Sequence, residues 1–169
     1  SDGNDFPEMI FDWYRSHGYD FVAMTDHNLL QIGDKWLDLE SIRKRQKAVG
    51  PDAVTKAEKR FGKDWLNRET REGKEGIVLK TLAECRDLLE KPGEFYLLPA
   101  EEMSNSGGKK PIHINVLNLD EAIPPVKDDA RSTREVMHLS MRSIGEHIEK
   151  SKRPILAHLN HPNFQWAFT

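Results

Sequence analysis

The chain has 169 residues, with 25 lysines and arginines against 28 aspartates and glutamates, and its formal charge at pH 7 is −3. This near balance argues against a dedicated nucleic-acid binder, so we expect no nucleic-acid partner. Charged residues make up 31% and the mean hydropathy is −0.69, as in folded chains with a charged surface. We also expect no membrane partner, because no apolar run approaches the roughly 18 residues of a membrane span.

The first half of the chain predicts a helix, a strand and a helical insertion. Asp5 can cap a helix with Pro7 just inside it, and apolar residues recur at helical spacing until Gly18. Residues 19–25 are apolar and favour a buried strand, which ends in the polar cluster Thr25-Asp26-His27-Asn28. Residues 29–78 mix charges of both signs with a few aromatics, which predicts solvated helices.

The second half continues the alternation of helices and strands. Thr81 and Glu84 form a capping box ahead of a helix whose apolar stripe includes Cys85, which we interpret as a core residue rather than a nucleophile. The remaining pattern predicts, in order, a strand at 95–100, a turn-rich loop at 104–110, a strand at 112–119, a helix capped by Ser132 and Glu135, and a strand at 154–157. This alternation favours an α/β domain with a largely parallel sheet or barrel.

Histidines and carboxylates gather near the predicted strand ends. The candidate ligands are Asp2, Asp26, His27, Glu101, Glu102, His113, His158 and His161. Imidazole nitrogens mixed with carboxylate oxygens, without a thiolate, suit Zn, Mn or Fe. A single such residue is more often an ordinary polar residue at a strand end, but parallel α/β folds bring several strand ends around one pocket. The sequence contains no serine nucleophile elbow, phosphate-binding P-loop, dinucleotide fingerprint or H-E-x-x-H motif.

The order of these motifs resembles that of a known family. The motifs are Ser1-Asp2-Gly3, Thr25-Asp26-His27-Asn28, Pro99-Ala100-Glu101-Glu102-Met103-Ser104, His113 and the segment 158–164. Together they are similar to the motifs of PHP domains, the polymerase and histidinol phosphatase family of metal-dependent phosphoesterases. The resemblance implies a distorted (β/α)7 TIM-like barrel that holds up to three Zn, Mn or Fe ions. Here it implies a partial barrel, with residues 29–78 as a helical insertion.

The same resemblance implies roles for individual residues. Asp2, His27, Glu102 and His113 match metal ligands of the family, with Glu102 as the bridging carboxylate, while Asp26 would orient its neighbours. The Ala-His-Pro motif of the family falls either on His158, where Leu159 replaces proline, or on His161-Pro162. Asp26, His27 and Glu102 are the residues expected to take part in catalysis.

Two histidine-containing motifs of the family have no counterpart in this sequence. PHP domains carry a His-x-His pair shortly before the Ser-Asp-Gly motif and an Asp-x-His pair near the end of the barrel. We therefore expect residues 1–169 to be a single PHP-like domain truncated at both ends. The predicted function is hydrolysis of a small phosphorylated substrate, a phosphomonoester or phosphodiester, by a metal-activated water. The alternatives are a PHP-like scaffold without activity and a PHP-type nuclease, which would use the same metals.

Overall fold

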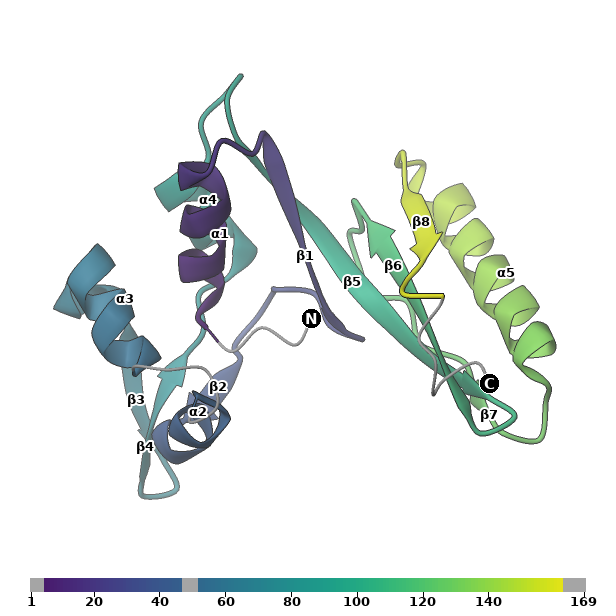
Figure 1. The fold of residues 1–169 in the computed structure, drawn as a ribbon, viewed down its shortest axis with the longest axis horizontal. Helices are drawn as coiled ribbons and strands as arrows, with labels where there is room; N and C mark the ends of the chain where they lie inside the picture. The colour runs from purple at the N-terminus through teal and green to yellow at the C-terminus, as the bar shows by residue number, and fades with distance from the viewer. Residues whose placement is uncertain (1–4, 47–51, 163–169) are drawn as a thin grey trace. The chain divides into compact units, whose positions relative to one another are not determined.

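The computed structural model describes residues 5–46 and 52–162. Within these residues the chain divides into two compact units, each assembled from separate segments (Figure 1). The first unit contains residues 23–30 and 98–162, and the second contains residues 5–22, 31–46 and 52–97. The single domain over residues 1–169 that the sequence suggested stays a prediction.

The first unit is a mixed sheet packed against a long helix. Its described strands follow the order β1-β5-β6-β8, and the short β7 pairs with β5 in parallel. The first residues of β1 and β5 belong to the second unit. The elements are β1 (Phe21–His27), β5 (Tyr96–Gly107), β6 (Lys110–Leu117), β7 (Lys127–Asp128), α5 (Thr133–Ser151) and β8 (Leu156–Leu159).

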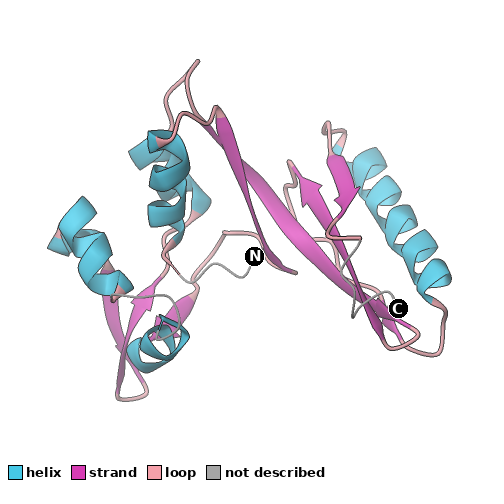
Figure 2. Ribbon diagram, in the orientation of Figure 1, coloured by secondary structure: helices cyan, strands magenta, loops and turns pink. Residues whose placement is uncertain are grey.

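A two-residue turn joins β5 to β6 in an antiparallel hairpin, whose strands are drawn in magenta in Figure 2 and labelled in Figure 1. Gly108 and Lys109 form the turn with φ of +59° and +62°, the left-handed conformation that matches the twist of paired strands. The pairing runs from Gly107 opposite Lys110 to Ala100 opposite Leu117. The prediction of a loop over residues 104–110 was therefore wrong, because most of that segment belongs to the strands.

Alternation along this hairpin separates a core face from a polar face. Helix α5 covers one face of the sheet (Figure 1), where Met103, Ile112, Ile114 and Val136 are buried together. The residues that alternate with these along the strands, including Glu102, point to the opposite face of the sheet. The hairpin thus provides both the apolar core of the first unit and the polar surface on which the candidate site lies.

The second unit combines helices with a small antiparallel sheet of order β2-β4-β3. Its elements are α1 (Pro7–Ser16), β2 (Trp36–Asp38), α2 (Leu39–Gln46), α3 (Ala53–Phe61), the 3-10 helix η1 (Lys63–Trp65), β3 (Asn67–Arg71), β4 (Lys74–Val78) and α4 (Leu82–Leu89). Residues 29–78 were expected to be helical, but α2 and α3 share this segment with the sheet. A buried cluster that includes Phe6, Ile42, Val54 and Ile77 connects these helices with β4.

Several local predictions were confirmed. The capping boxes Thr81–Glu84 and Ser132–Glu135 are formed at the starts of α4 and α5. Helix α1 begins with Pro7 as expected, although Phe6 rather than Asp5 is its N-cap residue. Cys85 is fully buried on α4, and burial raises the pKa of its thiol to about 12, as expected for a core residue rather than a nucleophile.

The predicted barrel, by contrast, was wrong. The described residues form no closed barrel, and both the β5–β6 and β6–β8 pairs are antiparallel. A (β/α)7 barrel needs a helical crossover between successive parallel strands, but the tight turn between β5 and β6 forces an antiparallel pair. No described helix is long and apolar enough to cross a membrane.

Candidate metal centre

Three side chains that are far apart in the sequence meet on the polar face of the first unit. One potential ligand atom from each of His27, Glu102 and His113 lies within 4.8 Å of the others. His27 ends β1, Glu102 lies in the middle of β5, and His113 lies on β6 directly opposite Ser104. Since Glu102 is two residues from Ser104, the side chains of Glu102 and His113 leave the hairpin on the same face.

His161 joins this group from the segment that follows β8. Its Nε2 atom is 3.1 Å from His113 Nδ1 and 3.3 Å from Glu102 Oε1, and His113 Nδ1 is 2.9 Å from the same oxygen. Two imidazole nitrogens and one carboxylate oxygen therefore form a compact triangle. The His113 and His161 rings meet edge to face, with their centroids 5.0 Å apart.

His27 approaches the other oxygen of the same carboxylate. Its Nδ1 atom lies 3.7 Å from Glu102 Oε2 and 2.6 Å from the hydroxyl of Ser104. Asn28 fixes the adjoining backbone: its N–H donates to the carbonyl of Glu102, and its side-chain oxygen accepts from the N–H of Ser104. Asn28 has φ of +53°, a left-handed conformation that asparagine tolerates better than most residues.

Asn160 also holds the carboxylate of Glu102. Its side-chain amide donates to Glu102 Oε1 at 2.9 Å, and its backbone N–H donates to the carbonyl of His113 at 2.9 Å. Asn160 therefore connects two of the clustered residues through separate hydrogen bonds. Polar residues in this position orient metal ligands in many proteins.

The environment favours the protonation states that metal ligands require. Burial raises the pKa of Glu102, but the Asn160 amide and the neighbouring His113 and His27 outweigh it, and the net pKa is lowered. Burial also lowers the pKa of His113, aided by His161 and His27, although Glu102 opposes the shift. An ionised carboxylate beside a neutral imidazole offers lone pairs to a cation.

The remaining predicted site residues lie elsewhere. Asp2 is outside the described residues, and Asp26 precedes His27 on β1, so its side chain leaves the strand on the opposite face. Glu101 is fully buried, and its Oε1 accepts a hydrogen bond from the Ile123 N–H at 2.7 Å. His158 is exposed on β8. Of the two histidines that the sequence left open, the structure brings His161 to Glu102 and His113.

Ser104, Asn28 and Asn160 support the site but were not among the predicted site residues. Asn28 and Asn160 both stand next to a histidine of the cluster in segments that follow strands. That adjacency is a signal in the sequence, because residues that orient metal ligands commonly lie beside them. Ser104 could be found only once the antiparallel register placed it opposite His113.

Comparisons with known proteins add no assignment: no family model, curated protein or solved structure matches this chain. The chemistry of the site therefore rests on its own geometry.

The donor set fits a divalent transition-metal ion. Ligand atoms bound about 2.1 Å from one ion are about 3.0 Å apart at right angles and about 3.4 Å apart at tetrahedral angles. The three distances between His113 Nδ1, His161 Nε2 and Glu102 Oε1 range from 2.9 to 3.3 Å. Histidine and carboxylate without thiolate are ligands typical of Zn, Mn and Fe.

Proposed function

We propose that this protein is a metal-dependent hydrolase that acts on a phosphoester. The observation that carries the proposal is the triangle formed by His113, His161 and Glu102, with His27 at the second carboxylate oxygen. When bound, a divalent ion would lower the pKa of a coordinated water toward about 7 and neutralise charge on the phosphoryl oxygens. The resemblance to PHP domains supports the choice of phosphoesters among the possible substrates.

The residues of the chain have separate tasks in this proposal. His113, His161 and Glu102 would hold an ion, and His27 would help to hold an ion beside the same carboxylate. Ser104 holds the His27 ring, and Asn160 holds the carboxylate. Because the side chain of Glu102 is only 5% exposed, its charge is poorly screened and attracts a cation strongly.

The first experiment measures metal content and hydrolysis together. The purified chain is dialysed against metal-free buffer, loaded with Zn²⁺ or Mn²⁺, and analysed by mass spectrometry of the metals. Hydrolysis is followed with p-nitrophenyl phosphate as a monoester and bis-p-nitrophenyl phosphate as a diester. We expect retained metal and metal-dependent release of p-nitrophenol from one of the two esters.

Three variants connect the result to these residues. Glu102→Gln and His161→Ala should lower metal content and hydrolysis together, whereas His158→Ala should change neither, because His158 is exposed and outside the cluster. Equal metal content in all four proteins would contradict the assignment of ligands. Bound metal without hydrolysis of either ester would favour the inactive scaffold, and cleavage of single-stranded DNA in its place would favour the nuclease.

A further inference from the structure

Asn115 on β6 carries a buried polar atom that the proposed site does not use. Its side-chain oxygen, Oδ1, is buried, and no described residue donates a hydrogen bond to it. His158, which faces Asn115 on β8, is among the residues that make no such bond. Folded proteins rarely leave a buried acceptor without a partner, because the atom gives up its bonds to water and gains nothing in return. The Asn115 oxygen therefore calls for a partner other than the described side chains.

The strand register places Asn115 among the residues of the candidate metal centre. Asn115 lies directly opposite Glu102 in the β5–β6 pair, and it follows His113 on β6 by two residues. The side chains of all three residues therefore leave the sheet on the same face. Directly opposite residues of an antiparallel pair have Cβ atoms about 4.5–5.5 Å apart. The Asn115 amide thus begins beside two of the groups that would hold an ion.

A side-chain amide oxygen suits some divalent ions better than others. Zn²⁺ is bound mostly by four ligands in a tetrahedron, with nitrogen and sulfur prominent among them. Carbonyl and carboxylate oxygens are the preferred ligands of Mn²⁺, which takes an octahedral set. Glu102, His113 and His161 already approach the number that Zn²⁺ needs, whereas Mn²⁺ requires further oxygens. An additional amide oxygen consequently contributes more to the binding of Mn²⁺.

We infer that Asn115 is a further metal ligand, which holds the ion through Oδ1 together with Glu102, His113 and His161 and favours Mn²⁺ relative to Zn²⁺. The ion supplies the partner that the buried oxygen lacks among the described residues. The inference rests on the metal centre of the proposed function. It does not depend on the hydrolysis of a phosphoester, because the role of Asn115 is in binding the ion.

The test measures the affinity of the purified chain for each ion without any substrate. Mn²⁺ binding is followed by electron paramagnetic resonance of the free ion, and Zn²⁺ binding by competition with a fluorescent chelator. Asn115→Leu removes the oxygen at similar size and should weaken Mn²⁺ by at least about tenfold, the effect of one interaction with a charged group. The loss for Zn²⁺ should be smaller. Asn115→Asp keeps an oxygen at this position and should bind Mn²⁺ at least as tightly as the original chain does.

Urea denaturation provides a second measurement. In buffer with EDTA, Asn115→Leu should have a higher midpoint than the original chain, because the substitution removes a buried acceptor without a partner. Added Mn²⁺ should raise the midpoint of the original chain more than that of Asn115→Leu, because an ion stabilises the folded state in proportion to its affinity. A lower midpoint of Asn115→Leu in EDTA would contradict the inference.

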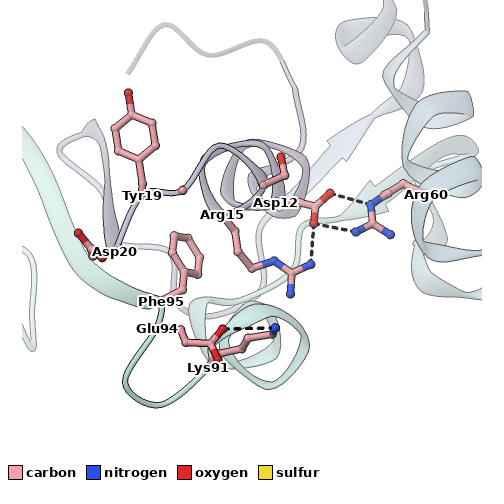
Figure 3. Close-up of a pocket in the computed structure, with 10 residues that line it drawn as sticks. Asp12, Arg15, Tyr19, Asp20, Arg60, Lys91, Glu94 and Phe95 are labelled. Atoms are coloured by element: carbon pink, nitrogen blue, oxygen red, sulfur yellow. Dashed lines mark hydrogen bonds and ion pairs between the residues drawn. The ribbon is translucent and has the colours of Figure 1, made fainter.

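A control tests for Mn²⁺ held by an exposed carboxylate in the second unit. Asp20 lines a pocket of that unit (Figure 3). Asp12 in the same pocket accepts hydrogen bonds from Arg15 and Arg60. The Asp20 side chain makes no hydrogen bond or ion pair within the described part of the chain. Asp20→Asn should bind both ions as the original chain does.

The outcomes separate this inference from the proposed function. Unchanged Mn²⁺ affinity in Asn115→Leu, equal losses for the two ions, or an equal loss of Mn²⁺ in Asp20→Asn would overturn the role of Asn115. None of these results would remove the centre formed by Glu102 and the histidines. An original chain that binds neither ion would overturn both proposals, whereas bound metal without phosphoester hydrolysis would contradict the proposed function alone.

Discussion

Replacing Asn160 with alanine should weaken metal binding without removing a ligand. The variant loses the 2.9 Å hydrogen bond from the Asn160 amide to Glu102 Oε1 but keeps the backbone bond to the His113 carbonyl. A hydrogen bond to a charged group contributes about 1.5–3 kcal/mol. If that bond orients the carboxylate for the ion, its loss corresponds to roughly 10- to 150-fold in affinity. Removal of residues that orient metal ligands typically costs about 10- to 100-fold, so the two estimates agree.

The assay is a competition titration of Zn²⁺ against a fluorescent chelator, carried out on the original chain and three variants. Asn160→Ala should bind Zn²⁺ about 10- to 100-fold more weakly, Glu102→Gln should bind it more weakly still, and His158→Ala should bind it normally. The ordering matters because Asn160 acts through Glu102. If Asn160→Ala bound Zn²⁺ as tightly as the original chain while Glu102→Gln lost the metal, Asn160 would have no orienting role. If Asn160→Ala bound Zn²⁺ more weakly than Glu102→Gln, Asn160 would itself be a ligand.

Three further predictions concern stability and are measured by urea denaturation. Gly107→Ala should destabilise the first unit by about 1–3 kcal/mol, because a Cβ at this position would lie 2.6 Å from Val136 Cγ2. Gly145→Ala on α5 should stabilise the unit by about 0.5–1 kcal/mol, because an added Cβ there would have no neighbouring atom within 4 Å. Equal effects of the two substitutions would refute the packing argument. Thr81→Ala should cost about 1 kcal/mol through loss of the capping box, and an unchanged midpoint would contradict it. Burial raises the pKa of Glu8 above its ordinary value of 4.5, so the stability due to its protonated form is lost as pH rises through the folded-state pKa. Glu8→Gln should therefore gain stability relative to the original chain as pH rises above 4.5. A difference in unfolding free energy between the two proteins that stays constant with pH would count against this prediction.

The elements predicted well are those specified by short-range chemistry. The capping boxes at Thr81 and Ser132 form because each needs only two residues three positions apart. Pro7 marks the start of α1 for a similar reason, since its fixed φ suits the first turn and its missing N–H costs no hydrogen bond there. Such signals do not depend on the rest of the fold, so one sequence is enough to read them.

The topology was misjudged because alternation of helices and strands does not specify strand direction. Gly108 and Lys109 were interpreted as part of a turn-rich loop, yet both residues adopt positive φ and reverse the chain within two residues. The strands β2 to β4 were missed for a related reason: the charged sequence of β3 is typical of an edge strand with solvent-exposed side chains, which resembles a solvated helix in composition.

Four of the candidate ligands lie together despite the wrong topology, because their clustering needs less than a barrel. In a hairpin, residues equally distant from the turn face each other, so His113 meets Ser104 and lies diagonally from Glu102. Strand β8 pairs with β6, and this pairing brings Asn160 and His161 next to His113. The sequence alone could not distinguish His158 from His161, but the register does. His158 lies on the paired strand opposite Asn115, whereas His161 lies beyond the end of β8, has a φ of +31° and places its ring beside Glu102. Two antiparallel pairs and the end of β1 are therefore sufficient to assemble the three histidines around one carboxylate, and the metal chemistry proposed here requires that arrangement rather than a closed barrel.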